Sequence, residues 1–207
     1  MRLDLKNHWD HIYSTRQPWE LSWNQKMPGI SLDFIHDLNL PASVRIIDIG
    51  GGDSQLVDCL LAEGYRNITV LDISEQGISR ARNRLGESGH SVTWIVSDIA
   101  QFHPTEKYDL WHDRATFHFL TEKTEIHQYL RIAGKCVRAY MVLGTFSESG
   151  PLKCSGLEIR RYSENDLQET LAEEFTKIRC RTEDHITPFN TRQNFIFCSF
   201  RKKQQKT

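Results

Sequence analysis

Hydrophobic and polar positions along the central part of the chain follow two alternating patterns. Short, continuous apolar runs predict buried strands at about residues 44–47, 68–71, 92–96, 108–111 and 139–146. Between these runs, apolar residues recur at helical spacing, which predicts helices over about residues 56–64, 74–86 and 121–135. Strands that alternate with helices predict an α/β fold on a mostly parallel sheet with helices on both faces.

The last third of the chain has a different pattern. Residues 147–162 are rich in turn formers, and Ser163 with Asp166 resembles a helix capping box. Two final strands are predicted at residues 175–186 and 194–201. No helix fits between these two strands, so we expect them to pair antiparallel.

The segment before the first strand is rich in aromatic residues. Trp9, Ile12 and Tyr13 share one face of a predicted helix that Pro18 ends, and Trp23 follows in a loop. Two interpretations remain open. The rings pack on the sheet as core, or they form a lid over a ligand, since small-molecule sites are often lined by aromatic side chains.

The glycine loop after the first strand is the strongest chemical signal. The first strand ends at Asp48, the glycines of residues 50–52 follow, and the next strand ends at Asp72. Glycines between a strand and a helix allow a tight turn and the close approach of a ligand. An acid at the end of the second strand is placed to accept both hydroxyls of a ribose. The pattern therefore predicts a nucleotide-like ligand.

The spacing of the loop separates two kinds of nucleotide. Dinucleotide folds use G-x-G-x-x-G to seat a pyrophosphate on a helix N-terminus. Here the third glycine position is Ser54, and Asp48 and Asp53 flank the loop. Two carboxylates repel a pyrophosphate and suit a ligand that carries an amino group and no phosphate. S-adenosylmethionine, an adenosine joined to a sulfonium and an amino acid, has this chemistry.

A third strand also ends in an acid, Asp98. Alone, an aspartate at this place is most simply a loop cap. Ligands of open α/β sheets bind at the carboxyl ends of the strands, however, and three successive strands end in acids there. We therefore expect Asp98 to accept a hydrogen bond from the exocyclic amine of adenine.

The fourth strand delivers four polar residues to the same edge of the sheet, namely His112, Asp113, Arg114 and His118. They form either a structural network or the wall of a site, and their place at the strand end favours the wall. His112, Asp113 and His118 are the candidate bases for catalysis. No metal is predicted, because the histidines lack a paired ligand motif.

Composition and charge exclude several classes of protein. The 207 residues carry 26 basic and 27 acidic side chains, a net charge of -1, which gives no general attraction to nucleic acid or anionic membranes. No apolar run approaches the roughly 20 residues of a membrane span, and the first 20 residues lack a signal-peptide core. The five cysteines form no C-x-x-C pair, so we expect reduced thiols and a cytoplasmic protein.

Over roughly residues 8–200 the chain resembles class I S-adenosylmethionine-dependent methyltransferases. The resemblance is carried by DIGGGDS, Asp72 and the SDI of residues 97–99. HDRATFHFL, GPLKCSGLEIRRYS and the opening HWDHIYSTRQP resemble a group of small bacterial methyltransferases. The family fold implied is a Rossmann-like, seven-stranded, mostly parallel sheet of order 3-2-1-4-5-7-6 with strand 7 antiparallel. We expect one domain over residues 1–200 with an N-terminal helical lid of about residues 1–40, and a basic tail at 201–207.

The resemblance also implies the ligand and the residues that hold it. The cofactor is S-adenosyl-L-methionine and the product is S-adenosyl-L-homocysteine. Asp48 and Gly50 are expected near the methionine part, Asp72 on the ribose and Asp98 on the adenine. The full set of expected cofactor contacts is Trp9, Trp23, Asp48, Gly50, Gly51, Gly52, Asp72, Ile73, Asp98, Ile99, Asp113 and Arg114.

The expected reaction is in-line transfer of a methyl group, which depends mainly on proximity and alignment. The acceptor is unknown, with a small molecule favoured over a protein side chain and bulk nucleic acid disfavoured; monomer is the default. A non-catalytic binding protein on the same fold remains an alternative. A nicotinamide-dependent oxidoreductase is disfavoured by the missing third glycine and the absence of a Tyr-x-x-x-Lys pair.

Overall fold

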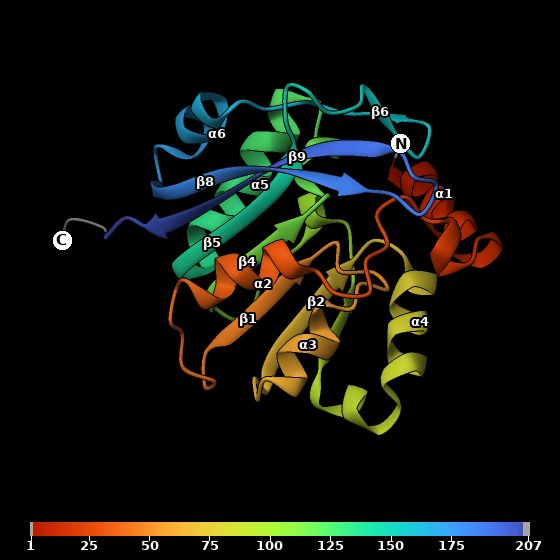
Figure 1. Cartoon of the computed structure of the whole chain (residues 1–207). Coiled ribbons are helices and arrows are strands. Elements are labelled where there is room, and N and C mark those ends of the chain that lie inside the picture. Colours follow the sequence, from red (N-terminus) through yellow and green to blue (C-terminus); the bar gives the residue numbers. More distant parts are fainter. Residues whose placement is uncertain (1, 205–207) are drawn as a thin grey trace.

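A seven-stranded sheet forms the centre of the computed structural model, which describes the backbone of residues 2–204 and the side chains of residues 4–204. The order in the sheet is β3-β2-β1-β4-β5-β9-β8 (Figure 1). The strands are β1 Arg45–Ile49, β2 Asn67–Asp72, β3 Thr93–Val96, β4 Tyr108–Arg114, β5 Val137–Phe146, β8 Phe175–Ile186 and β9 Arg192–Lys202. The first five run parallel, and β9 is antiparallel to both β5 and β8.

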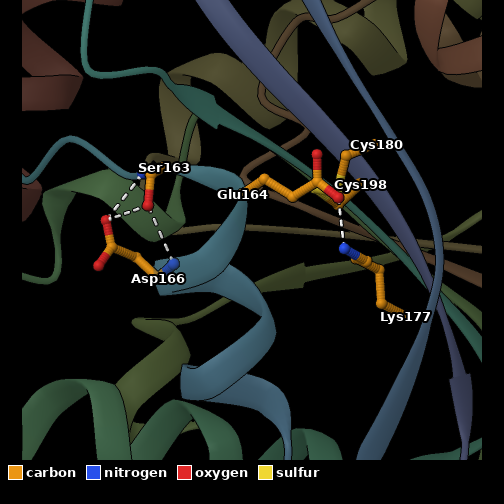
Figure 2. Close-up of a disulfide and its surroundings, with 6 residues drawn as sticks. All are labelled: Ser163, Glu164, Asp166, Lys177, Cys180 and Cys198. Atoms are coloured by element: carbon orange, nitrogen blue, oxygen red, sulfur yellow. Dashed lines mark hydrogen bonds and ion pairs between the residues drawn. A yellow bond between two sulfur atoms is a disulfide. The ribbon is translucent and has the colours of Figure 1, made fainter.

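The predicted order 3-2-1-4-5-7-6 is confirmed, because β8 and β9 are the sixth and seventh strands of this sheet. Two further short strands, β6 (Lys153–Cys154) and β7 (Leu157–Glu158), form a separate ribbon within the turn-rich segment. The predicted capping box is also confirmed: Ser163 Oγ accepts from the Asp166 N–H at 3.0 Å, at the start of α6 (Figure 2).

Helices cover both faces of the sheet. One face packs α2 (Gly29–His36) and α3 (Leu56–Ala62), and the other packs α5 (Lys123–Cys136) and α6 (Glu164–Leu171) (Figure 1). Alternation along β1 explains the two cores: Ile46 and Ile47 are both fully buried, and they belong to opposite faces. Burying such a side chain contributes roughly 1.5–3 kcal/mol, so both faces of the sheet must be covered.

The N-terminal segment divides into two parts with different surroundings. Helix α1 (Arg2–Thr15) lies against α4 (Glu75–Leu85), held where Asp10 Oδ1 accepts from Ser74 Oγ at 2.7 Å and from the Gln76 N–H at 3.2 Å (Figure 1). Helix α2, in contrast, buries Phe34 and Ile35 completely against the sheet. Helix α1 therefore packs beside α4, whereas α2 belongs to the core, and the lid expected over about residues 1–40 stays a prediction.

The expectation of five reduced thiols is wrong. Cys180 of β8 and Cys198 of β9 face each other across the antiparallel pair, with Cα atoms 4.1 Å apart, and form a disulfide (Figure 2). The free cysteines of the described residues are Cys59, Cys136 and Cys154. Sequence spacing could not reveal the bond, because 18 residues separate its cysteines and only the register of the hairpin brings them together.

The C-terminal end of the sheet lies slightly beyond the expected boundary. Strand β9 continues through Arg201 and Lys202, and Lys202 Nζ donates to the Gly134 carbonyl at 2.6 Å and pairs with Glu174. The rest of the expected basic tail includes residues 205–207, which lie outside the described residues. No helix in the described part of the chain has the length and apolarity to cross a membrane.

Candidate functional site

A cavity of about 280 Å³ lies at the carboxyl ends of β1 to β4, the edge where open α/β sheets bind ligands. Most of the predicted site residues line it, namely Trp9, Trp23, Asp48, Gly50, Gly51, Asp72, Ile73, Asp98, Ile99, His112 and Arg114. Gly52, Asp113 and His118 are not among the lining residues. The order of the strands puts Asp98 and Asp72 at one end of the cavity, Asp48 in the middle, and residues of β5 and β9 at the other end.

Two positions of the loop require glycine, and at each of them the backbone conformation and the lack of space are both reasons. Gly50 has φ +67°, and a Cβ there would lie 1.7 Å from Thr116 Oγ1. Gly52 has φ +45°, and a Cβ there would lie 2.4 Å from the Tyr13 hydroxyl. Residues with a side chain rarely adopt this left-handed backbone conformation, and a side chain at either position would also clash with its neighbours. The loop therefore packs closely against Thr116 and against Tyr13 of α1, which leaves no room for a side chain at Gly50 or Gly52.

Asp72 is buried at the end of β2, where its Oδ1 accepts from the Ser74 N–H at 2.7 Å. Burial, together with the nearby carboxylates of Asp48 and Asp53, raises the pKa of the Asp72 carboxyl to about 7. The N–H groups of Ser74 and Gly52 act in the opposite direction. A carboxylate held at this position is short of positive partners and suited to accept from hydroxyl groups of a ligand.

Asp48 belongs to a buried chain of three polar side chains. Its Oδ1 lies 2.7 Å from His112 Nδ1, and His112 Nε2 lies 3.0 Å from Ser31 Oγ. An ionised Asp48 requires a proton on Nδ1, which leaves Nε2 to accept from the Ser31 hydroxyl. A neutral His112 therefore satisfies both neighbours. The chain joins β1, β4 and α2, and it fixes the direction of the Asp48 carboxylate.

Asp98 follows β3 and lines the cavity while capping a short 3-10 helix. One of its oxygens accepts from the Ala100 N–H at 2.9 Å. The structure thus supports both interpretations of this residue, the loop cap and the cavity acid, because a carboxylate has acceptor capacity for more than one donor.

Asp113 lies behind the cavity wall and shapes the turn after β4. Its oxygens accept from the Tyr129 hydroxyl at 2.7 Å and from the Thr116 N–H at 3.0 Å. Burial raises the pKa of Asp113 to about 6, although these hydrogen bonds favour the ionised form. The turn includes Ala115, whose φ of +71° is a strained value for a residue with a side chain. Asp113 thereby helps to hold the backbone that presents Arg114.

His118 is fully buried between aromatic rings, with its ring stacked 4.4 Å from that of Phe146. Neither ring nitrogen has a hydrogen-bond partner among the described residues. Burial, together with the charge of Arg114, lowers the pKa of His118 to about 3. At neutral pH His118 is therefore an uncharged ring behind the cavity wall.

Arg114 lies half-buried with its exposed part in the cavity. It donates to the Trp23 carbonyl at 3.1 Å, and its guanidinium carbon lies 5.5 Å from the centre of the Phe195 ring. Burial lowers the pKa of Arg114 to about 10, which keeps it charged at neutral pH. It forms no ion pair with a carboxylate among the described residues, Asp113 included, although the charge of Asp48 opposes the lowering of its pKa.

Sequence reasoning missed several lining residues, chiefly Tyr13, Phe119, Phe146, Gln193 and Phe195. They come from α1, a 3-10 helix, β5 and β9, which meet only in the folded protein. For Gln193 and Phe195 the sequence did contain one signal, the predicted direction of the last strand. An antiparallel final strand must start at the carboxyl edge of the sheet, so its first residues lie beside the site.

Comparisons with known proteins agree with this architecture. Residues 46–139 match the family described as methyltransferase domain. The chain is 33% identical over 72 residues to nodulation protein S of Bradyrhizobium diazoefficiens, covering 35% of this chain and 34% of that protein. It is 37% identical over 78 residues to malonyl-[acyl-carrier protein] O-methyltransferase of Anoxybacillus flavithermus, covering 37% of this chain and 29% of the relative. These similarities therefore span about a third or less of each relative.

Similarity to solved structures extends over nearly the whole chain. N-methyltransferase NodS from Bradyrhizobium japonicum, solved with S-adenosyl-l-homocysteine, superposes with a TM-score of 0.75 at 18% identity, covering 96% of this chain and 98% of that one. The 1,6-didemethyltoxoflavin-N1-methyltransferase of Burkholderia thailandensis gives a TM-score of 0.74 at 20% identity, covering 97% and 88%. The fold is that of class I S-adenosylmethionine-dependent methyltransferases, and the predicted resemblance to that class is confirmed.

Proposed function

We propose that this protein is a methyltransferase that uses S-adenosylmethionine and acts on a small-molecule acceptor. The observation that carries the proposal is the row of buried acids Asp48, Asp72 and Asp98 at the ends of adjacent parallel strands, beside a glycine loop that lines the same cavity. A pyrophosphate is disfavoured beside three carboxylates, whereas hydroxyl and amino groups are favoured.

The residues present fit the parts of this ligand. Asp72 is suited to the ribose hydroxyls, and Asp98 with Ile73 and Ile99 to the adenine. Asp48 and the backbone of Gly50 and Gly51 line the cavity and are suited to the amino acid part. When bound, S-adenosylmethionine supplies a methyl group that its sulfonium has already activated.

The protein's own contribution is therefore positioning and exclusion of water. The His112 ring is engaged on both sides by Asp48 and Ser31, so we assign it the task of orienting Asp48. We assign Asp113 and His118 to the support of the wall. Trp9, Tyr13 and Trp23 of the N-terminal segment line the cavity and shield part of it from water. Alignment of this kind can supply most of the acceleration of a displacement reaction.

The test is calorimetric titration of the purified protein with S-adenosylmethionine, S-adenosylhomocysteine and NAD. We expect binding of the first two by the wild type and a loss of at least tenfold in affinity, about 1.4 kcal/mol, in Asp72→Asn. Asp33→Asn is the matched control, because Asp33 lies on the surface and forms an ion pair with Arg181 at 3.6 Å. Binding of NAD alone would replace the proposal with a nicotinamide-dependent one.

A methyl acceptor of low molecular weight fits the size and closure of the cavity. The balanced charge of the chain argues against nucleic acid as acceptor. A monomer remains our working assumption, whereas the expected cytoplasmic location loses its support from reduced thiols because Cys180 and Cys198 form a disulfide. Incubation with radiolabelled S-adenosylmethionine and a size-fractionated cell extract tests the acceptor, with label in the small-molecule fraction as the expected outcome and label on protein as the contrary one.

A further inference from the structure

The cavity has two chemically different ends. The strand order places Asp72 and Asp98 at the end formed by β2 and β3, and Phe146 and Phe195 at the end formed by β5 and β9. We call the second the aromatic end and define it by Trp9, Trp23, Arg114, Phe119, Phe146, Gln193 and Phe195. Its rings are in contact: the ring centres of Phe119 and Trp9 lie 5.2 Å apart, and those of Phe195 and Phe146 lie 4.4 Å apart. Such a wall favours a flat apolar ligand that stacks on it.

Arg114 gives the aromatic end a fixed positive charge. Among the described residues that line the cavity, it is the one arginine or lysine. Its guanidinium group is oriented by the Trp23 carbonyl and the Phe195 ring and not by a carboxylate. The Asp48 carboxylate lies near enough to raise the pKa of Arg114 but forms no ion pair with it, so an anionic ligand at this place would supply a direct partner for a partly buried charge.

Gln193 supplies a second, independent polar group at the same end. It lies two residues before Phe195 on β9, and its Oε1 is buried with no hydrogen-bond partner among the described residues. A buried amide oxygen usually accepts a hydrogen bond. The lack of a donor for this oxygen therefore indicates that a ligand supplies one.

We infer that the aromatic end binds a small planar molecule carrying a negatively charged group that pairs with Arg114, together with a hydrogen-bond donor for Gln193. This inference rests on the proposed function, because it describes the methyl acceptor. A ligand that stays cationic when bound is disfavoured on the same grounds, since it would meet the Arg114 charge in a partly desolvated space.

The test measures binding and not turnover. Protein saturated with S-adenosylhomocysteine is titrated with three matched pairs of probes: benzoate and benzamide, 2-naphthoate and 2-naphthamide, and indole-3-carboxylate and its amide. Benzylammonium is the cationic probe. The variants are Arg114→Met and Arg114→Lys. The control is Arg192→Met, whose side chain is exposed on the same strand as Gln193 and pairs with Asp184 at 3.3 Å.

We expect the wild type to bind at least one carboxylate tenfold or more tightly than its amide, and benzylammonium not at all. This preference is lost in Arg114→Met and retained in part in Arg114→Lys and fully in Arg192→Met. Equal binding of acids and amides by the wild type in all three pairs overturns the inference, and this comparison needs no variant to fold.

A second measurement separates Arg114 from the methionine part of the cofactor. If Arg114 instead binds that carboxylate, Arg114→Met loses at least tenfold in affinity for S-adenosylhomocysteine but not for 5′-methylthioadenosine, which lacks the amino acid. That result overturns the inference and leaves the proposed function intact. Failure of the wild type to bind S-adenosylhomocysteine is the separate failure of the proposed function.

Discussion

His112 shows how a single residue can be assigned a role from its hydrogen bonds. Its Nδ1 faces Asp48 and its Nε2 faces Ser31, both within 3.0 Å, so neither nitrogen is free to take a proton from an acceptor. An asparagine can place a donor close to the position of Nδ1, whereas a leucine cannot. We therefore expect His112→Asn to keep most of the affinity for S-adenosylhomocysteine and His112→Leu to lose it.

The contrasting outcome is specific. If His112 acted as a general base, both variants would bind the cofactor and lose turnover. The wild-type rate would then rise with pH as the base loses its proton, and the residual rate of the variants would not. Ser31→Ala is the control on the far side of the ring. It removes one buried hydrogen bond, at a cost of about 1 kcal/mol in the free energy of unfolding, and should leave cofactor affinity nearly unchanged.

Asp72 predicts a pH dependence of cofactor binding. Its pKa of about 7 in the free protein means that it is mostly protonated at pH 6 and mostly ionised at pH 8. Since ribose hydroxyls are better held by the carboxylate, the affinity for S-adenosylhomocysteine should rise about tenfold from pH 6 to pH 8. Titration at both pH values checks this, and Asp72→Asn should show no such rise. Equal affinity of the wild type at both values would contradict it.

At the residue scale, the acids of the site could be predicted and the aromatic wall could not. Asp48 and Asp72 directly follow apolar runs, and Asp98 follows one after Ser97, so their place at the carboxyl edge follows from strand direction alone. Phe119 and Phe146 are ordinary core residues in sequence, and only the fold turns one part of their surface to the cavity.

At the scale of elements, the β8–β9 pair depends on a covalent bond. The Cys180–Cys198 disulfide closes a loop of 18 residues, for which chain entropy corresponds to roughly 3 kcal/mol. We expect a reductant to lower the melting temperature of the wild type by about 10 °C. The melting temperature of Cys180→Ala should not respond to reductant, whereas Cys59→Ala should respond like the wild type.

Thiol titration in denaturant provides the independent check on this bond. Without reductant, three of the five cysteines should react, namely Cys59, Cys136 and Cys154. Reaction of all five, together with a melting temperature that reductant does not change, would show that the two strands are held by hydrogen bonds and packing alone.

Most of the helices and strands could be predicted from the sequence, because along the central sheet the spacing of apolar residues and the residue composition indicate the same elements. Strand β5 is near-continuously apolar, as expected for a strand covered on both faces, and α5 has an amphipathic pattern. The β6–β7 ribbon was not predicted, since its strands have two residues each and no periodicity can appear over that length.

The whole molecule gives up stability to hold the buried acid of the site. A rise in the pKa of Asp72 from 3.8 to about 7 means that the folded state binds more protons than the unfolded state between these pH values. Stability therefore falls as pH rises through this range, by an amount on the order of 4 kcal/mol at pH 8. Asp72→Asn removes the charge and keeps an oxygen for the Ser74 N–H.

Ligand-free Asp72→Asn should thus be more stable than the wild type at pH 8 and equal to it near pH 4. Other titrating groups such as His118 are common to both proteins, so they cancel in the difference. Denaturant unfolding of both proteins across this range measures it, and a constant difference would contradict the assignment. With saturating S-adenosylhomocysteine at pH 8 the order should reverse, because the ligand stabilises the wild type in proportion to its tighter binding. The same carboxylate would then weaken the empty protein and strengthen the complex.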